Sequence, residues 1–432
     1  MGRAKLGQER CSFSRMSEKE ELYATILGVR APWRVTQVNV SAAQEEVTVT
    51  IAARSDQQHP CPSCGKACAG YDTRRRSWRH LDTCQFKTIL VADVPRIECG
   101  EHGVLQIETP WAEPGSGFTA LMERLIIDWS LEASISAVAR RMRLSWDEID
   151  GVKQRAVQRG LARRKLEAIT HVGVDETSFQ RGHEYVTVVN DLERGRVLYV
   201  ADGRAHGSLD GFWVLLSDDQ RAAIEAVAMD MCAGYMRSTL EHVPQARSKI
   251  CFDRFHVSKL LNDAVNTVRK QENRELAAEG AYVPKGTKYV WTQNPEKMPQ
   301  DRRAMFELLR DCALKAGRAW AIKDAARWLW SYAKRGWAEK AWKRWIGWAM
   351  RSRLEPMKHV ACTIRDQLWG IVNAIVLRVT NAGAESLNAK IQWIKKQACG
   401  FRNRERFRNA IYFHCGALDL YPRPASATHT TS

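Results

Sequence analysis

Residues 171–179 read HVGVDETSF and begin the stretch that decides the fold. Apolar, β-branched segments predict three successive strands here, after which the pattern alternates between helix and strand. We expect strands over residues 169–175, 185–190, 197–201, 223–229 and 248–252, and helices over residues 209–216 and 236–242. The stretch therefore predicts an α/β domain.

Two aspartates mark the ends of strands in this stretch. Asp175 ends the first expected strand, and Asp230 directly follows the fourth, within AIEAVAMDMC. Three strands followed by alternating helix and strand is the order of the ribonuclease-H-like fold, and open α/β sheets place their sites at the carboxyl ends of strands. A single Asp after a strand is more often a turn or a helix cap. Two of them, on strands that adjoin in this topology, favour a shared site.

A third acid, Glu385, lies in the later segment NAGAESLNAKIQ, which has the pattern of a helix. The polar face of this helix comprises Asn381, Glu385, Asn388 and Gln392, and the apolar side comprises Leu387, Ile391 and Ile394. A polar face turned inward is costly unless it binds something, and a solvated outer face is the alternative. Two carboxylates at strand ends and a third on a helix can hold two Mg²⁺ ions about 3.5–4 Å apart for phosphoryl transfer.

The charge of the chain indicates an anionic partner. Its 432 residues include 66 Lys and Arg against 49 Asp and Glu, a formal net charge of +17, and the pI is near 9.5. We expect this partner to be nucleic acid, although each basic cluster alone also fits a solvated face. The basic clusters are residues 74–79 and residues 395–408, the second of which contains Lys395, Lys396 and Arg402.

The sequence predicts neither a membrane span nor secretion. It has no run of 18 apolar residues, and its N-terminal segment has no continuous apolar core. The 12 cysteines therefore indicate reduced thiols or metal sites rather than disulfides. We expect a cytoplasmic protein.

Four metal-ligand residues occur as two pairs with the spacing of zinc knuckles. CPSCG offers Cys61 and Cys64, and CGEHG offers Cys99 and His102, each pair across a two-residue gap. These side chains match one closed structural Zn²⁺ site within a small β-rich module. Buried cysteines without metal are the alternative. Lower-ranked substitutes for the four ligands are His59, Cys68, His80 and Cys84.

Helical patterns follow from residue 118 to about residue 165. Two helices joined by a three-residue turn fit a helix-turn-helix, whose last helix can enter a major groove. A plain three-helix packing unit is the alternative. We expect Ser134 to cap a helix over residues 135–142, a turn over residues 143–145, a helix over residues 146–157, and DNA contacts from Arg155, Arg159 and Arg163.

Between residues 255 and 379 the chain is mostly helical and rich in tryptophan. We expect a helical insertion in which the Trp side chains form the core. The alternative is that one or two of them stack on DNA bases, while basic residues on the opposite face follow the phosphates. The residues expected on one helical face are Trp330, Trp337, Ala341, Trp345 and Trp348.

Both ends of the chain are expected to lie outside the folded domains. Residues 17–20 match a capping box ahead of a first helix, so we expect structure to begin at Ser17. Met16 is therefore a candidate for the start of the chain in place of Met1. We expect residues 1–16 to form a disordered leader and residues 421–432 a disordered tail.

Taken together, the motifs resemble those of DDE transposases of bacterial insertion sequences, in the ISL-three-type branch. They are CPSCG with CGEHG, SWRHLD, VDETSFQRGHEYVTVV, ADGR, VAMDM, CFDRFHV and NAGAESLNAKIQ, in this order, and they span nearly all of the chain from Met16 to about Leu420. The resemblance implies a zinc-binding domain over residues 17–112, a helix-turn-helix region over 113–166, a ribonuclease-H-like core over 167–265 and 365–420, and a helical insertion over 266–364.

The resemblance also assigns roles to residues. It implies that the catalytic acids are Asp175, Asp230 and Glu385, and that an Asp-x-x-His element formed by Asp253 and His256 lies beside the site. We expect Asn381 and Asn388, on the face of Glu385, to support the site as well.

The implied function is that of a transposase, which binds the terminal inverted repeats of an insertion sequence. It would catalyse metal-dependent strand cleavage and strand transfer on double-stranded DNA, at transposon ends and target. Two Mg²⁺ or Mn²⁺ ions would activate water and stabilise the leaving 3′ oxygen, and one Zn²⁺ would be structural. We expect a nucleoid-associated bacterial protein that assembles as a homo-oligomer on DNA. Two alternatives stay open: a catalytically inactive DNA-binding regulator, and a nuclease that cuts without strand transfer.

Overall fold

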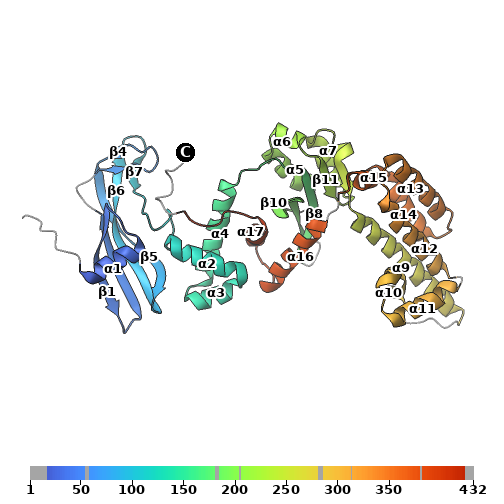
Figure 1. Ribbon diagram of the computed structural model, residues 1–432, viewed down its shortest axis with the longest axis horizontal. Coiled ribbons are helices and arrows are strands. Elements are labelled where there is room, and N and C mark those ends of the chain that lie inside the picture. Colours follow the sequence, from blue (N-terminus) through green and yellow to red (C-terminus); the bar gives the residue numbers. More distant parts are fainter. Residues whose placement is uncertain are drawn as a thin grey trace, which may run out of the picture. The chain divides into compact units, whose positions relative to one another are not determined.

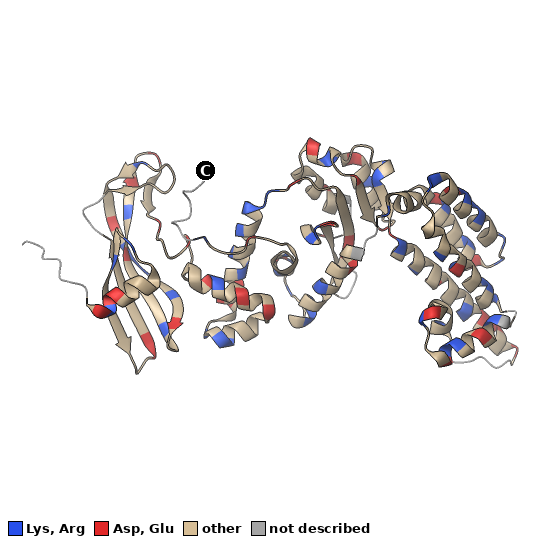
Figure 2. Cartoon of the chain, in the orientation of Figure 1, with Lys and Arg blue, Asp and Glu red and all other residues tan. Residues whose placement is uncertain are grey.

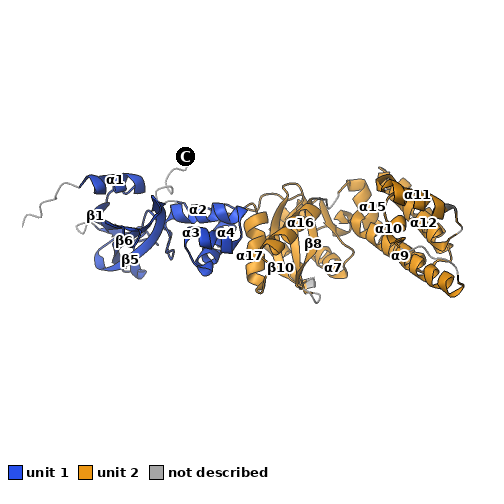
Figure 3. Cartoon of the chain, turned by 90° about the horizontal axis from the view of Figure 1, so that it is seen from below, with its two compact units in different colours: residues 1–163, 418–432 blue, residues 164–417 orange. Residues whose placement is uncertain are grey.

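The computed structural model describes residues 17–53, 58–180, 184–203, 206–280, 286–312, 314–379 and 382–423. The chain forms two compact units, shown in different colours in Figure 3. Unit 1 consists of Met1–Arg163 and Leu418–Ser432, and unit 2 consists of Arg164–Ala417. Unit 2 is therefore inserted between two parts of unit 1. The predicted disordered leader, residues 1–16, lies outside the described residues.

Unit 1 begins with helix α1 (Glu18–Leu27), followed by a five-stranded sheet (Figure 1). Ser17 and Glu20 form the predicted capping box at the start of α1. The strands of the sheet follow the order β1-β2-β6-β5, and β7 also pairs with β6. Strands β2 and β6 are parallel, and all other neighbouring strands of this sheet are antiparallel. The strands are β1 (Trp33–Ser41), β2 (Glu46–Ala53), β5 (Gly70–Thr83), β6 (Phe86–Cys99) and β7 (Gly103–Gln106), with a separate hairpin of β3 (His59–Pro60) and β4 (Ala67–Cys68).

Alternate residues of the long strands build the core of this sheet. Strand β6 buries Leu90, Ala92 and Val94, as the two-residue period of a strand requires. At one end of the core, Trp111 meets Trp33 and Trp78 edge to face, with ring centroids 4.9 and 5.4 Å apart. Such aromatic pairs stabilise the fold beyond the area they bury.

Three helices complete unit 1: α2 (Ala120–Glu132), α3 (Ile135–Met142) and α4 (Trp146–Arg163). Ser134 caps α3 as predicted, and Arg143 ends it in the left-handed conformation with φ 55°. Ser145 then starts α4 through reciprocal hydrogen bonds with Glu148. Helix α4 extends beyond residue 157, where the prediction ended it, because its continuation buries a face against other parts of unit 1.

Residues 418–423, which we name the C-terminal clip, pack against α2 and α4. Leu420 is buried, Arg159 donates to its backbone oxygen, and Arg163 donates to the backbone oxygen of Tyr421 at 2.7 Å. The Tyr421 hydroxyl donates to Asp128 Oδ1 at 2.6 Å. The prediction of a disordered tail from residue 421 is therefore wrong for residues 421–423, because their carbonyls and ring find partners on distant helices. Residues 424–432 lie outside the described residues.

Gly160 on α4 gives a direct test of the C-terminal clip. A Cβ at this position would lie 2.6 Å from the Leu418 Cβ and 3.3 Å from the Asp419 backbone oxygen. We expect Gly160→Ala to lower the thermal midpoint and to expose the chain after residue 417 to proteolysis, since overpacking costs about 1–3 kcal/mol.

The matched control is Gly151→Ala on the same helix. Its Cβ would meet only the Arg155 guanidinium, at an ordinary 3.5 Å. We expect this change to raise stability, because Ala favours a helix over Gly by about 1 kcal/mol. Equal stabilisation by both substitutions, measured by thermal denaturation of the full chain, would contradict the packing of the clip on α4.

Unit 2 is built on a sheet of five strands in the order β10-β9-β8-β11-β12. Neighbours β10, β9 and β8 pair antiparallel, and β8, β11 and β12 pair in parallel. All five predicted strands are present, as β8 (His171–Gln180), β9 (Glu184–Asp191), β10 (Arg196–Asp202), β11 (Ala226–Met229) and β12 (Ile250–Phe252).

The expectation that Asp175 ends its strand is wrong. Strand β8 continues to Gln180 because its hairpin with β9 continues as far as Glu184. The parallel pairing of β8 with β11, in contrast, ends at Gly173, which pairs with Ala228. Asp175 thus lies where β8 extends past its parallel neighbour, so the residue still reaches the carboxyl edge of the parallel half of the sheet.

Helices cover both faces of this sheet (Figure 1). On one face, Phe212, Trp213 and Tyr235 pack in a core that includes Val174 and Val189. On the other, Leu387, Ile391 and Phe407 pack with Val186 and Val188. The helices that supply these residues are α5 (His206–Leu215), α7 (Ala233–His242), α16 (Ala382–Gln397) and α17 (Arg404–Cys415), and short helices α6 (Asp218–Ala222) and α8 (Ala246–Lys249) lie in the connections.

A mostly helical segment connects β12 to α16. Its core is continuous with one face of the sheet and contains Trp291, Trp342 and Trp345. Its helices are α9 (Arg254–Ala278), α10 (Lys288–Thr292), α11 (Gln300–Asp311), α12 (Lys315–Trp328), α13 (Arg335–Met350), α14 (Glu355–Asp366) and α15 (Leu368–Leu377). In the described part of the chain no single helix is long and apolar enough to cross a membrane; α14 and α15 pass such a test only as a pair, which bends by 67°.

Candidate functional site

Three aspartates lie at one edge of the sheet in unit 2. Asp175 is on β8, Asp230 directly follows β11, and Asp253 directly follows β12, where it caps α9. Because β8, β11 and β12 are parallel neighbours, their carboxyl ends meet at the same edge. The topology therefore brings together acids that are 78 residues apart at most in the sequence, from Asp175 to Asp253.

These carboxylates and His256 act on one another electrostatically. The pKa of Asp175 is raised to about 6, mainly because burial disfavours its charged form. The carboxylates of Asp230 and Asp253 act in the same direction, whereas the backbone N–H of Glu176 and the charge of His256 act against it. Burial also raises the pKa of Asp253. A bound cation would relieve this crowding of negative charge, and carboxylate oxygens are the ligands that Mg²⁺ prefers.

Each aspartate is oriented by a backbone amide. Asp175 Oδ1 accepts from its neighbour's N–H at 2.8 Å, Asp230 Oδ1 from the N–H of Cys232 at 3.0 Å, and Asp253 Oδ1 from the N–H of Phe255 at 3.2 Å. These local bonds restrict the side-chain rotamers. Each carboxylate is thereby held by the backbone of its own turn.

Helix α16 runs along β8 with polar residues toward the strand. Asn388 Nδ2 donates to Asp175 Oδ2 at 2.6 Å, Gln392 Nε2 donates to Thr177 Oγ1 at 2.7 Å, and Lys395 Nζ donates to the backbone oxygen of Ser178 at 2.8 Å. The spacing of four and three residues keeps these side chains on one helical face. The polar face of α16 is therefore engaged with the acidic strand rather than only with solvent.

Glu385 is exposed on the first turn of α16, three residues before Asn388 and on the same face. Among the described residues, only Cys61, Cys64, Cys99 and His102 bring ligand atoms close enough together to form a metal-binding group. Neither the three aspartates nor Glu385 with them form such a closed group among the described residues. Its role stays a prediction. Asn381, predicted to support the site, lies outside the described residues.

The three arginines predicted to contact DNA from α4 have protein partners. Glu123 on α2 is buried, with 1% of its side chain exposed, and it forms ion pairs with Arg155 at 2.7 Å and with Arg159 at 2.8 Å. Arg163 forms an ion pair with Asp419 of the C-terminal clip at 3.1 Å. A buried carboxylate requires such cations, since breaking a buried ion pair is strongly destabilising. The structure gives these arginines a role in holding unit 1 together, and DNA contacts from them stay a prediction.

Other basic residues of unit 1 do face solvent. Arg140 and Arg141, in the last turn of α3, are exposed, and the Arg141 guanidinium lies 4.8 Å from the ring centroid of Trp129. Sequence reasoning missed this pair, although two adjacent arginines just before the turn of a helix-turn-helix are a visible signal. In unit 2, Lys396 and Arg402 are exposed, whereas Lys395 is hydrogen-bonded to β8.

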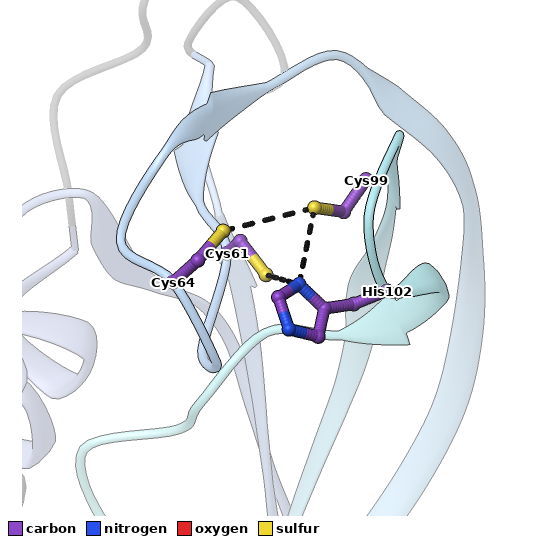
Figure 4. Close-up of side chains that lie close together, drawn as sticks. All are labelled: Cys61, Cys64, Cys99 and His102. Carbon is purple, nitrogen blue, oxygen red and sulfur yellow. Dashed lines mark hydrogen bonds between the residues drawn. The ribbon is translucent and has the colours of Figure 1, made fainter.

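The four predicted zinc ligands converge in unit 1 (Figure 4). Cys61 and Cys64 lie in the β3–β4 turn, and Cys99 and His102 lie in the β6–β7 turn. Cys61 Sγ lies 3.9 Å from His102 Nδ1, Cys64 Sγ lies 3.8 Å from Cys99 Sγ, and Cys99 Sγ lies 3.5 Å from His102 Nδ1. Tetrahedral zinc, with bonds of about 2.3 Å to sulfur and about 2.0–2.1 Å to nitrogen, requires ligand separations of roughly 3.5–3.8 Å. The cluster therefore has the dimensions of a zinc site.

The turns and the chemistry of the cluster also suit zinc. Each knuckle ends in a glycine with positive φ, Gly65 at 73° and Gly103 at 68°, which allows the tight turns. The hydrogen bond with His102 and nearby backbone N–H groups lower the pKa of Cys99 to about 6, which favours the thiolate that binds metal. Of the lower-ranked substitutes, His80 contacts Thr119 at 2.8 Å and Cys84 is exposed. Cys68 lies beside the cluster: its thiol interacts with Cys99 and donates to the Lys66 backbone oxygen at 3.3 Å.

Comparisons with known proteins match each of these regions. A family model described as transposase, for the DDE transposases of ISL3, matches residues 172–411. A second model, for the helix-turn-helix domain of transposase family ISL3, matches residues 107–157. A third, for the zinc-finger of transposase IS204/IS1001/IS1096/IS1165, matches residues 57–102. The transposase for insertion sequence element IS1557 of Mycobacterium tuberculosis is 27% identical over 384 residues, covering 83% of this chain and 86% of the relative. The transposase for insertion sequence element IS1001 of Bordetella parapertussis is 24% identical over 352 residues, covering 80% and 86%.

Proposed function

This chain belongs to transposase family ISL3, and on that premise we propose that unit 2 cuts and joins DNA at its acidic sheet edge while unit 1 binds the terminal inverted repeats of the element. The enzyme is a DNA-binding transposase, and its net charge of +17 suits that partner. The observation that carries the site assignment is the edge where half-buried Asp175 lies with Asp230 and Asp253. Carboxylates crowded in this way have a clear use as metal ligands.

The strand order supports a ribonuclease-H-like assignment for the core. Three antiparallel strands followed by two parallel ones, β10-β9-β8-β11-β12, agree with the order of elements expected for that fold. The helical segment over residues 266–364 is then an insertion between β12 and the helix that carries Glu385. Cytoplasmic localisation at the nucleoid and assembly of copies on DNA belong to the same proposal.

Asp175, Asp230 and Glu385 would hold two divalent ions, Mg²⁺ or Mn²⁺, because all three offer the oxygen ligands that these hard cations prefer. When bound, such ions activate water as the nucleophile at a phosphodiester and stabilise the leaving 3′ oxygen. The 3′-OH freed by cleavage then attacks target DNA in the same site. The Zn²⁺ of unit 1 is structural and takes no part in this chemistry.

The surrounding residues position the acids. The Asn388 amide holds Asp175 Oδ2, and the N–H of Glu176 holds Oδ1, so the carboxylate keeps one orientation. Asp253 caps α9 and thereby fixes the first turn of the helix that carries His256. The charge of His256 lowers the pKa of Asp175, which favours the ionised form that binds metal. We propose that these residues support catalysis without themselves replacing an acid.

A metal-dependent assay separates this function from the two alternatives. The full chain should nick DNA carrying the element's ends when Mg²⁺ is present and should not do so in EDTA. Joined end–target products should then appear. Binding without cleavage under any metal condition would favour a regulator. Cleavage that never yields joined products would favour a nuclease.

The exposed arginines of α3 provide a further prediction for end binding. We expect the double substitution of Arg140 and Arg141 by Ala to weaken binding and to reduce the salt slope of log K by about 2, since each phosphate contact contributes about 0.9. Arg159→Ala should instead lower the thermal midpoint, because it leaves buried Glu123 with fewer cations. Binding isotherms at several salt concentrations and thermal denaturation separate the two effects. A pure loss of DNA affinity in a fully stable Arg159→Ala protein would restore the sequence-based assignment.

A further inference from the structure

The surface of helix α13 combines exposed aromatic rings with cations. The helix buries Ala338, Trp342 and Ala349 completely, whereas Trp337 and Trp348 are 61% and 43% exposed. The expectation that Trp337, Trp345 and Trp348 share one face is therefore wrong for Trp345, which is buried. The buried face passes through residues 338, 342, 345 and 349, so the two outer Trp lie close together in angle on one flank of the helix.

The cations lie on the same side as the exposed rings. Exposed residues at steps of three or four positions form a line along the helix, which we name the α13 stripe. Within it, Lys340 Nζ lies 5.8 Å from the ring centroid of Trp337. Figure 2 shows Lys and Arg along this helix, and its sequence contains a single acid, Glu339. The members of the α13 stripe are Trp337, Lys340, Arg344, Trp348 and Arg351.

The stripe is chemically suited to a polyanion with flat apolar groups. Eleven residues separate the two Trp, or about 16 Å along a helix that rises about 1.5 Å per residue. Two rings so far apart would contact different nucleotides, and the cations between them would meet phosphates. Aromatic platforms beside a basic track are how proteins bind nucleic-acid strands with accessible bases. A second copy of this chain fits poorly, because two such stripes would repel each other.

We propose that the α13 stripe binds a DNA strand with unpaired bases. The base faces of an intact duplex are stacked on one another and hidden, whereas strand cleavage creates a strand end at which terminal bases can unpair. Trp337 and Trp348 stack on bases, and Lys340, Arg344 and Arg351 neutralise phosphates. This inference rests on the proposed function, because strand cleavage by unit 2 supplies such an end.

The test uses two double variants of the full chain. Trp337→Ala with Trp348→Ala removes the rings and keeps the charge, and Lys340→Ala with Arg344→Ala does the reverse. Binding of a fluorescein-labelled 20-nucleotide single strand is compared with binding of the same sequence as a blunt duplex. We expect the ring variant to weaken single-strand binding about ten-fold or more, with little effect on the duplex. The charge variant should lower the single-strand salt slope by about 1.4.

Controls on the same unit decide where the effect arises. Trp328→Ala removes another Trp that is 62% exposed but lies outside the stripe, and Lys270→Ala removes an exposed cation of α9. Both should bind single strands like the wild type, and circular dichroism should show all variants folded.

Unchanged single-strand binding in both double variants would overturn the inference. An equal loss of duplex binding, or an equal loss of single-strand binding in Trp328→Ala, would overturn it too. A change in oligomer mass by light scattering, without a change in DNA affinity, would assign the stripe to protein contacts and overturn it as well. Normal end cleavage by the variants would show that the proposed function still stands, whereas a wild type that neither binds nor cuts DNA would contradict that function itself.

Discussion

Asp175→Asn should abolish strand cleavage and at the same time stabilise the metal-free protein at pH 8. Cleavage should fall by more than about 100-fold, because even an outer partner of a metal ligand is worth about 10–100-fold. Stability should rise because burial raises the pKa of Asp175 from 3.8 to about 6. A carboxyl shifted in this direction contributes stability below pH 3.8 and loses it as the pH rises through about 6. Near pH 8 the ionised group therefore costs about 2–3 kcal/mol, which the neutral amide avoids.

Thermal denaturation in EDTA at pH 5 and pH 8, with and without Mg²⁺, measures this effect. The wild type should lose stability between pH 5 and pH 8 relative to the variant, and Mg²⁺ should restore stability in the wild type alone. Asp219→Asn, at an exposed aspartate of α6, is the control and should change neither cleavage nor melting. Full cleavage by Asp175→Asn would remove this residue from the site and leave the fold intact.

Glu385→Ala belongs to the same experiment. We expect it to lose cleavage as Asp175→Asn does, but without the gain in stability, since Glu385 is exposed. DNA binding should be kept by both variants, because phosphate and base contacts lie elsewhere. Comparable cleavage by Glu385→Ala and the wild type would point to Asp253, which already lies at the acidic edge, as the third ligand.

Cys64→Ser should unfold the zinc-binding part of unit 1 and abolish end binding. A structural Zn²⁺ contributes its binding free energy to folding, on the order of 10–16 kcal/mol in zinc-finger peptides at pH 7. The loss of one thiolate from a site whose ligand atoms lie within 4.8 Å of one another should therefore outweigh the stability of the surrounding sheet. Metal analysis should find one Zn²⁺ per wild-type chain and far less in the variant.

Cys84→Ser is the matched control for this experiment. Cys84 is a free, exposed thiol of the same unit and is not part of the cluster. It should retain zinc, end binding and the thermal midpoint of the wild type. A wild-type protein without zinc, or an equal loss of zinc in Cys84→Ser, would contradict the assignment of Cys61, Cys64, Cys99 and His102.

Local sequence patterns predicted those features whose physical cause is itself local. The capping box at Ser17 depends on residues three positions apart, and the zinc knuckles depend on pairs across two-residue gaps. The five strands of unit 2 follow from short apolar, β-branched segments. The order of these elements also placed Asp175 and Asp230 on adjoining strands, although Asp175 proved to lie within β8 rather than at its end.

Partnerships across the chain were decided by the tertiary structure alone. The sequence by itself determined which acids are candidates for catalysis, which four residues form the zinc-ligand cluster, and the basic character of the protein. Only the fold decided that Arg159 pairs with Glu113 and Glu123, that Tyr421 bonds to Asp128 on α2, and that Trp342 rather than Trp337 is buried. The physical reason is that a charge or a ring has the same sequence signal whether it meets water, a phosphate or a buried carboxylate. Its role depends on which distant residue folding brings within a few ångströms.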